Sequence, residues 1–592
     1  MMRIINKEFE KFTIIFTIFL LLFFYGGVVN YNCNAAQNEI SKSIALRIVP
    51  QELRGDYQKP ITRLEFCYLL WNLLCSLGFD SNQILKSNFI PIFSDTNDYK
   101  VRVLATLGVV NVEEKGMFYP NKTITKQEAA KMLFSTVTLC KRIPQIKQYY
   151  KIQLKCPTET EILPEDFYDG VNILPSAREA INYLYRIGVF NTDSNGCIEP
   201  NEKLTREKAI EAVLKLYRAA TGEIKNPISE ENLYPYIFAN NRTDSNIVWG
   251  YINSKGDWKI KPQFYEPSGF NFQGYAIAQD PNFIKDSYMV LDKQGKIYFK
   301  FQRVARLYGN LAVVDDGIYI LPQKKRLSSN IDAISDVIIY PQGDFLVPVK
   351  DDRTNLYGYY SFNGKKIIDF YYDMAYAFHK GKAVVKKKGK YYLIDKTGKV
   401  LKLFKIDDKK YDVKYFVGES GLLSSRDNSQ FIGYNANTGA HCFKAPQAML
   451  TEDGWFIVTD NSGRKIKKLF DTDGNIVANG KEIIDLGNGF YQVWGNNDER
   501  YIITNTKKVV IRCNNSNIYN WVYCKSGGGV VAIYSSEDTI TIVDAFGTIF
   551  SKVKLPSKNC KVDFINGLLR ITDTKTLMQY YYNPINGKQV LK

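Results

Sequence analysis

The chain has 592 residues, of which 45% are hydrophobic and 23% are charged, and these proportions are ordinary for globular proteins. The length is sufficient for several domains, and the composition excludes a chain that is disordered by default. The formal net charge is +17, which indicates attraction to anionic polymers without identifying one.

The first 36 residues follow the order typical of a secretory signal peptide. Arg3, Lys7 and Lys11 precede the uncharged run TIIFTIFLLLFFYGGVV, and the small residues of NCNAA follow before Gln37. An uncleaved membrane anchor is the alternative, because about 20 apolar residues span a bilayer. In both cases the chain after residue 36 lies outside the cytoplasm. An exported basic chain favours cell-wall polymers as partners over nucleic acid.

The cysteines and histidines indicate neither a disulfide framework nor a metal site. Nine of the ten cysteines remain after cleavage, and their odd number and irregular spacing favour buried free thiols. The only histidines are His379 and His441, and no two cysteines have C-x-x-C spacing. We therefore expect no metal, no cofactor and structural roles for both histidines.

One supersecondary unit recurs in the N-terminal part of the chain. The stretch GMFYPNKTITKQEAAKML at 116–133 is followed 80 residues later by GCIEPNEKLTREKAIEAVL, and a shorter version, KPITRLEFCYLLWNLL, begins at Lys59. Internal repetition of this kind predicts at least three copies of one unit that pack against each other.

Each copy carries a helix start signal. A threonine precedes an apolar stripe at helical spacing, which predicts N-caps at Thr62, Thr125 and Thr205. A glutamate three residues later completes a capping box in the first two copies, at Glu65 and Glu128. The third copy has Lys208 at this position and lacks the box.

The residue after each of these threonines is basic, which is unfavourable at a helix N-terminus. Arg63, Lys126 and Arg206 stand in the first turn, where a positive charge opposes the helix macrodipole. A violation repeated three times suggests function, and exposed N-terminal amides with an arginine predict a site for a carboxylate. The structural alternative is that each basic side chain pairs with a carboxylate of a neighbouring unit.

The stretch FSDTNDYKVRVLATLGVVNVEEKGMFYPNKTITKQEAAKML resembles the S-layer homology modules that anchor many bacterial surface proteins. The resemblance covers 37–220 as three modules, at about 38–80, 93–140 and 167–220. It implies an α-helical bundle of pseudo-threefold symmetry, with grooves that bind secondary cell-wall polysaccharide, commonly through a pyruvylated amino sugar. The positions to which it assigns polysaccharide binding are Arg63, Asp95, Lys126, Asp169 and Arg206.

The modules depart from the family pattern in different ways. The first lacks the Gly-x-Phe-x-Pro loop, the third lacks the capping glutamate, and the second has Lys126, which lacks the planar two-pronged donor of arginine. We therefore expect the groove that contains Arg63 to be the main binding site. Pro, Asn and charged residues predict linkers at 141–166 and 221–247, and the second marks the domain boundary.

Beyond residue 246 the pattern changes to short strands separated by tight turns. The turns have Asp or Asn, two further residues and then Gly, which supplies the positive φ that such hairpins need. These glycines stand at 256, 295, 364, 398, 439, 474, 547 and 587. Two long gaps in the series predict degenerate turns near LPQKKRL and TNTKKVV. The spacing predicts about ten units of roughly 37 residues with three or four strands each.

Residues 248–592 resemble WG repeats, which are named for the pair that stands here as Trp249-Gly250. Reduced versions occur at Tyr357-Gly358 and Lys390-Tyr391, and the remaining units match through the turn. The resemblance implies binding or scaffolding and offers no catalytic residues. Such units must stack, as a closed propeller or alternatively as an open β-solenoid. We expect core roles for most aromatic residues, with sugar stacking as the functional alternative.

These features together predict a multidomain, non-catalytic extracellular protein of a bacterial cell wall or S-layer. It is anchored to polysaccharide and displays a β-repeat domain for other surface proteins or glycans, and it meets a membrane only through an uncleaved signal segment. The alternative is a cell-wall glycan hydrolase or lyase, which needs two carboxylates facing one sugar. The abundant aspartates Asp292, Asp395, Asp471 and Asp544 all occupy turns, and turn closure explains them. A third interpretation makes the β-repeat domain a second wall-binding module.

Overall fold

The computed structural model describes residues 38–79, 93–110, 116–140, 167–223, 232–239, 247–280, 288–302, 306–314, 317–329, 344–451, 453–460, 466–487, 489–496, 499–513, 529–536 and 538–591. The predicted signal peptide at 1–36 and the predicted linker at 141–166 lie outside these residues. In the described part of the chain, no helix is both long and apolar enough to cross a membrane.

The chain divides into two compact units. The first contains residues 1–156, 183–190 and 201–228, and the second contains 157–182, 191–200 and 229–592. The range 167–220, predicted as one module, is thus shared between the two units. Within the second unit, the ring of Tyr168 packs against the rings of Phe272, Phe345 and Phe362.

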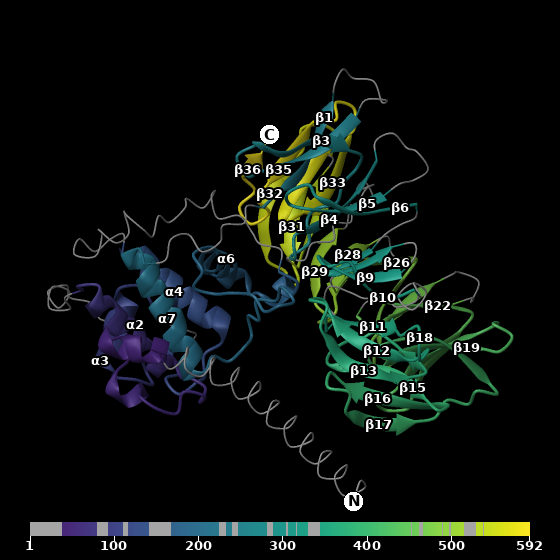
Figure 1. The fold of residues 1–592 in the computed structure, drawn as a ribbon, viewed down its shortest axis with the longest axis horizontal. Coiled ribbons are helices and arrows are strands. Elements are labelled where there is room, and N and C mark those ends of the chain that lie inside the picture. The colour runs from purple at the N-terminus through teal and green to yellow at the C-terminus, as the bar shows by residue number, and fades with distance from the viewer. Residues whose placement is uncertain are drawn as a thin grey trace, which may run out of the picture. The chain divides into compact units, whose positions relative to one another are not determined.

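Helices occupy the N-terminal part of the chain, drawn in purple and blue in Figure 1. The α-helices are α2 (Arg63–Ser76), α3 (Tyr99–Thr106), α4 (Lys126–Cys140), α6 (Arg178–Arg186) and α7 (Arg206–Thr221). The 3₁₀ helices include η1 (Gln51–Leu53), η4 (Gly170–Asn172) and η5 (Pro175–Ala177). Helices α2, α4 and α7 begin directly after the three predicted N-cap threonines, and the apolar stripes of α2 and α7 are buried.

The rest of the chain is all β and forms ten antiparallel sheets of three or four strands, each a meander in chain order. The first two sheets contain β1 (Tyr234–Ala239), β2 (Ile247–Ile252) and β3 (Trp258–Phe264), then β4 (Tyr275–Gln279), β5 (Tyr288–Asp292) and β6 (Ile297–Phe301). The third and fourth contain β7 (Arg306–Tyr308), β8 (Leu311–Val314), β9 (Gly317–Ile320) and β10 (Lys325–Ser328), then β11 (Leu346–Lys350), β12 (Tyr357–Ser361) and β13 (Lys366–Tyr372). The fifth contains β14 (Met374–Ala375), β15 (Lys382–Lys387), β16 (Lys390–Asp395) and β17 (Val400–Phe404).

The remaining five sheets continue the same pattern. The sixth contains β18 (Tyr411–Val417), β19 (Ser420–Ser425), β20 (Phe431–Asn435) and β21 (His441–Ala445). The seventh contains β22 (Gln447–Leu450), β23 (Phe456–Thr459), β24 (Lys467–Phe470) and β25 (Ile476–Gly480). The eighth contains β26 (Glu482–Gly487), β27 (Phe490–Trp494), β28 (Arg500–Thr504) and β29 (Val509–Cys513). The ninth and tenth contain β30 (Val530–Ser536), β31 (Thr539–Asp544) and β32 (Ile549–Lys554), then β33 (Cys560–Ile565), β34 (Leu568–Asp573), β35 (Gln579–Tyr582) and β36 (Gln589–Leu591).

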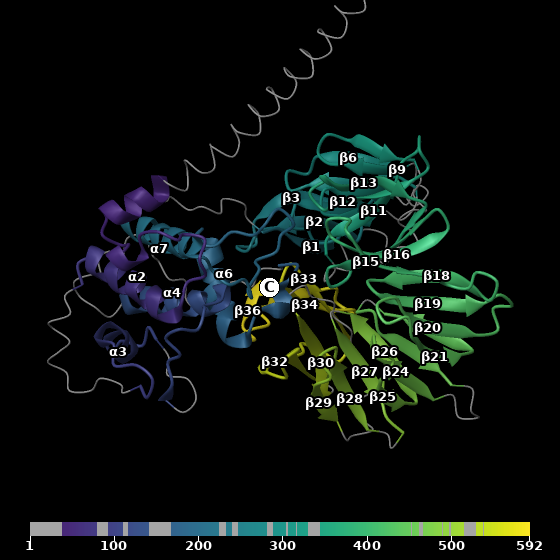
Figure 2. The same ribbon diagram turned by 90° about the horizontal axis from the view of Figure 1, so that it is seen from below.

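The ten sheets form a closed ring, as in a ten-bladed β-propeller. A hydrophobic cluster joins every sheet to the next one along the chain. A tenth cluster joins the last sheet back to the first, through Leu568, Tyr581 and Leu591 on one side and Tyr234 and Ile252 on the other. Figure 2 shows the sheets following one another, with the yellow last sheet beside the teal first sheet. An open solenoid would leave these two faces uncovered, so the propeller-like alternative is confirmed.

The first sheet begins earlier than the sequence suggests. Strand β1 lies inside 221–247, the predicted linker, and it pairs with β2 over six residue pairs from Tyr234↔Ile252 to Ala239↔Ile247. The first turn glycine, Gly256, lies between β2 and β3, so the glycine signal does not mark β1. The β unit therefore begins upstream of residue 248.

The Trp-Gly pair of the first sheet has a steric explanation. A Cβ atom added to Gly250 would lie 2.4 Å from the carbonyl oxygen of Ile260, on the neighbouring strand β3. At the equivalent Gly358, a Cβ atom would lie 2.6 Å from the carbonyl oxygen of Ile368. The strand register shifts beside both glycines, so each sheet carries an irregularity that brings the backbones close.

Candidate functional site

The three helix-start segments of the first unit are joined by a cycle of backbone hydrogen bonds. The N–H of Ile61 donates to the carbonyl of Leu204 (2.9 Å), that of Leu204 to Ile124 (3.1 Å), and that of Ile124 to Ile61 (3.1 Å). Each of these residues directly precedes a threonine N-cap. The three segments therefore lie next to one another, and each donates one hydrogen bond to one neighbour and accepts one from the other.

A second cycle uses the amide groups of the three basic residues. The N–H of Arg63 donates to the carbonyl of Lys122 (2.9 Å), that of Lys126 to Glu202 (2.8 Å), and that of Arg206 to Lys59 (2.9 Å). The expectation that exposed N-terminal amides form part of an anion site is wrong for these groups. Each of these amides already donates to a backbone carbonyl of another segment of the repeat, so it is not available to an anion.

The predicted caps form, with one difference between helices. The Thr62 hydroxyl accepts from Glu65 N–H (3.2 Å), and the Glu65 carboxylate accepts from Thr62 N–H (2.9 Å), which is a complete capping box. Thr125 and Glu128 make the same pair of bonds on α4. Thr205 accepts from Lys208 N–H (3.3 Å) and has no reciprocal carboxylate, as the sequence predicts.

The three basic side chains are buried, each at most 8% exposed, and their partners differ. Arg206 pairs with Glu65 on α2 (2.5 Å) and donates to the carbonyl of Gly55 (3.2 Å). Lys126 pairs with Glu202 (3.0 Å). These two cases match the structural alternative, because each carboxylate belongs to a neighbouring unit of the repeat.

Arg63 contacts a backbone carbonyl and an aromatic ring. Its Nε donates to the carbonyl oxygen of Phe118 (2.9 Å), and its guanidinium carbon lies 5.1 Å from the centre of the Phe118 ring. This is the same contact that Arg206 makes with Gly55, because both carbonyls stand seven residues before an N-cap threonine. The ring restrains the plane of the guanidinium group.

Glu65 joins the cap of α2 to Arg206. Burial alone would raise the pKa of Glu65, but the hydrogen bonds from Thr62 N–H and from Arg206 outweigh it and hold the pKa below its ordinary value. The carboxylate therefore stays charged at neutral pH, and an external anion would have to compete with it for Arg206.

The two predicted aspartates hold loops of their own modules. The carboxylate of Asp95 accepts from the N–H groups of Phe118 (2.8 Å) and Tyr119 (2.6 Å). That of Asp169 accepts from Ile198 (2.8 Å) and Glu199 (2.7 Å). Tyr119 and Glu199 both have positive φ, 58° and 54°, which is unfavourable for these residue types. Each aspartate stabilises a strained turn, and the looser match at Asp169 has the same geometry as Asp95.

The five predicted site residues do not form one cluster. Arg63, Asp95, Lys126 and Arg206 belong to the first unit, whereas Asp169 and the loop that it holds belong to the second. Burial raises the pKa of Asp169 above its ordinary value, although the N–H groups of Ile198 and Glu199 act in the opposite direction. Sequence reasoning did not single out Glu202, the carboxylate partner of Lys126, because nothing local marks it.

The β unit uses its abundant aspartates to close turns. Asp292, Asp395, Asp471 and Asp544 each accept two backbone N–H groups of their own turns, at 2.8 to 3.0 Å. Asp471 also pairs with Lys507 (2.7 Å). Among the described residues, no three His, Cys, Asp or Glu side chains are grouped so that they could hold a metal ion.

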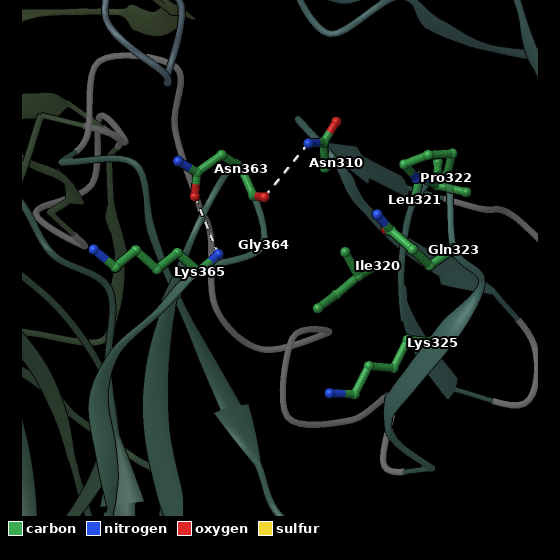
Figure 3. A pocket seen from close by; sticks show the side chains of 9 residues that line it. All are labelled: Asn310, Ile320, Leu321, Pro322, Gln323, Lys325, Asn363, Gly364 and Lys365. Atoms are coloured by element: carbon green, nitrogen blue, oxygen red, sulfur yellow. Dashed lines mark hydrogen bonds between the residues drawn. The ribbon is translucent and has the colours of Figure 1, made fainter. Parts of the chain in front are cut away.

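An open hollow of about 450 Å³ lies between the third and fourth sheets, and Figure 3 shows the side chains that line it. Asn310 Nδ2 donates to the carbonyl of Asn363 (3.4 Å), and the Asn363 side chain accepts from Lys365 N–H (3.1 Å). Lys325 and Lys365 are the titratable residues of its lining. The described residues of the lining include no carboxylate, so they do not supply the acid–base pair that glycan hydrolysis needs.

Comparison with known families places two kinds of module in this chain. The model of the S-layer homology domain matches residues 100–130 and 166–218, and that of the WG containing repeat matches 249–280 and 357–391. Both fall where the sequence resembles these families. S-layer homology domains generally bind cell-wall polysaccharide, so the match indicates a bacterial protein associated with the cell surface or S-layer.

Solved structures similar to this chain have low identity and low TM-scores. The designed protein Ika8 is 11% identical over 54% of this chain and 98% of its own, with a TM-score of 0.25. A eukaryotic initiation factor is 11% identical over 55% of this chain and 96% of its own, with a TM-score of 0.28. BamB from Moraxella catarrhalis is 12% identical over 55% of this chain and 91% of its own, with a TM-score of 0.21. No curated protein matches the chain.

Proposed function

We propose that this protein is a non-catalytic surface protein held to anionic secondary cell-wall polysaccharide by three S-layer homology modules. The modules form a helical bundle of pseudo-threefold symmetry, and the ten-sheet ring is the displayed part. The observation that carries the bundle is the double cycle of hydrogen bonds among the three helix starts. The absence of a catalytic role is supported by the turn aspartates, whose carboxylates already accept backbone amides.

The groove that contains Arg63 is the main binding site in this proposal. Its guanidinium group is held by the Phe118 carbonyl and ring. A pyruvyl carboxylate suits a planar guanidinium, because two parallel hydrogen bonds can form. Asp95 supports the site indirectly, since it fixes the loop that presents the Phe118 carbonyl.

Cosedimentation of the purified chain with native walls, and with walls stripped of secondary polysaccharide, tests this proposal. Arg63→Lys keeps the charge and removes the planar donor, so we expect about ten- to one-hundred-fold weaker binding to native walls. Arg54→Ala, an exposed arginine of the same module, is the matched control and should bind like the wild type. Binding that survives stripping, or that Arg63→Lys does not weaken in a normally folded chain, would contradict the assignment.

A further inference from the structure

A pocket lies at the seam where the ring closes between the first and last sheets. Its volume is about 360 Å³, and strands β1 and β2 of the first sheet and β33 and β34 of the last contribute to its lining. The lining residues that carry chemistry are Trp249, Tyr265, Glu266, Lys561, Asp563 and Arg570. We call this the seam pocket.

Trp249 brings a buried donor to the seam pocket. The residue is 8% exposed, and its Nε1 atom is buried with no acceptor at hydrogen-bond distance in the described part of the chain. A buried N–H without an acceptor costs about 1–3 kcal/mol. The equivalent residue of the fourth sheet, Tyr357, packs in the hydrophobic cluster with the fifth sheet, so a core role at this position does not require an indole.

Arg570 covers the indole and is held in place by Asp563. Its Nε donates to Asp563 Oδ1 (2.8 Å), its Nη2 pairs with Asp563 Oδ2, and its guanidinium carbon lies 5.5 Å from the centre of the Trp249 ring. Tyr581, whose hydroxyl donates to the carbonyl of Pro235, also acts on the Arg570 guanidinium by hydrogen bonding and by charge.

The charges of the seam pocket balance. Its lining has two cations, Arg570 and Lys561, and two anions, Asp563 and Glu266, of which Arg570 and Asp563 form an ion pair. A ligand that carries a full negative charge would disturb this balance, whereas a neutral carbonyl oxygen can accept from the indole without adding charge. Glu266 and Thr572 are acceptors on the same lining, and they suit ligand hydroxyl groups.

The size and walls of the pocket suit a sugar. A volume of about 360 Å³ is at the lower end of the range for small-molecule sites, which is roughly 300–1,000 Å³. Tyr265, which is half-buried, supplies apolar surface for a ring, while the polar groups fix its orientation. A ligand with a neutral carbonyl acceptor, hydroxyl groups and a ring has the chemistry of an acetamido sugar.

We propose that the seam pocket binds an N-acetylated amino sugar of a glycan, whose acetamido oxygen accepts a hydrogen bond from Trp249 Nε1. The site is independent of the Arg63 groove, and the proposal does not rest on the anchoring function. It gives the ring of sheets a ligand, at the one interface where the first and last sheets meet.

Indole NMR signals of the full chain, labelled with ¹⁵N-tryptophan, test the proposal directly. The chain has six tryptophans, and Trp249→Phe identifies the signal of Trp249. On titration with N,N′-diacetylchitobiose, we expect the Trp249 indole signal to shift with saturation. Cellobiose and the deacetylated glucosamine dimer, which lack the acetamido oxygen, should leave it unchanged, as should glucuronic acid.

Calorimetric titration with the same disaccharide supplies the affinity. Trp249→Phe keeps an aromatic ring and removes the donor, and we expect at least a ten-fold loss of affinity. Trp494→Phe is the matched control, because Trp494 also lies beneath an arginine, Arg500 at 4.5 Å, outside the seam pocket. An unmoved Trp249 signal, equal binding by Trp249→Phe, or equal binding of the deacetylated dimer or glucuronic acid would overturn the proposal.

Discussion

Lys324 and Lys507 show how far a single residue can depart from its consensus in this repeat. All eight predicted turn glycines have positive φ, between 69° and 86°. The two lysines have φ of 57° and 63° and stand in the two segments where the sequence predicted degenerate turns. A lysine in this region is unfavourable compared with glycine, so the surrounding sheet imposes the turn. The turn geometry persists in units that have lost its sequence signal.

His379 is a buried histidine, 8% exposed, at the turn before β15. Burial lowers its pKa below the ordinary value, while the charges of Asp453, Asp344 and Glu419 act in the opposite direction and that of Lys380 in the same one. The unfolded chain therefore binds a proton at higher pH than the folded chain. By linkage, the free energy of unfolding falls as the pH is lowered through about 6.5, by at most about 1.4 kcal/mol per pH unit for this group.

The pH dependence can be measured by chemical denaturation of the chain between neutral and mildly acidic pH. We expect His379→Gln to lose part of the decline in stability seen for the wild type. His441→Gln, at an exposed position, is the matched control and should keep the wild-type slope. A His379→Gln slope equal to that of the wild type would show that the decline comes from other groups.

At the scale of elements, local signals predict where helices α2, α4 and α7 begin, because a threonine cap acts on amides within three residues. The sequence could not predict that the same segments donate to one another in two cycles. Those bonds join residues far apart in the chain, such as Ile61 and Ile124. The sequence could not predict the partners of Arg63, Lys126 and Arg206 for the same reason.

The cap of α2 gives a prediction at this scale. Thr62→Ala removes the acceptor for Glu65 N–H and should destabilise the first unit by about 1 kcal/mol. Thr62→Ser keeps the acceptor and should retain most of the stability. Helical circular dichroism during thermal unfolding measures both. An equal loss in the two variants would assign the effect to the lost methyl group and not to the cap.

At the scale of the whole ring, closure is the feature that distinguishes a propeller from a solenoid. In an open array the outer face of the last sheet would be exposed, whereas in a closed ring both of its faces are buried. Leu568 and Leu569 are neighbours on β34 with opposite orientations, and both are 0% exposed. Leu568 packs in the cluster with the first sheet, and Leu569 packs in the cluster with the ninth.

This pair of leucines tests closure in solution. Because each fills a buried interface, we expect Leu568→Ala and Leu569→Ala each to lower the free energy of unfolding by about 2–5 kcal/mol. Tryptophan fluorescence during denaturation is a suitable measurement, because Trp249, Trp455 and Trp494 lie in the ring. An open array would make Leu568→Ala nearly neutral while leaving Leu569→Ala costly.

The sequence by itself determined the features that depend on neighbours along the chain. These are the repeat lengths, the turn positions, the caps, the turn roles of the aspartates and the number of β units. Each of these features depends on residues a few positions apart in the sequence, so a local pattern is sufficient to predict it. The resemblance to S-layer homology modules and WG repeats also follows from such short motifs.

The tertiary structure alone decided what depends on distant residues. It closed the ring by packing Tyr581 against Tyr234, and it neutralised Arg206 and Lys126 while holding Arg63 against Phe118. It also placed Arg570 over Trp249, more than 300 residues away. Burial and charge pairing between such residues depend on how the sheets and helices pack, and no local pattern encodes that packing.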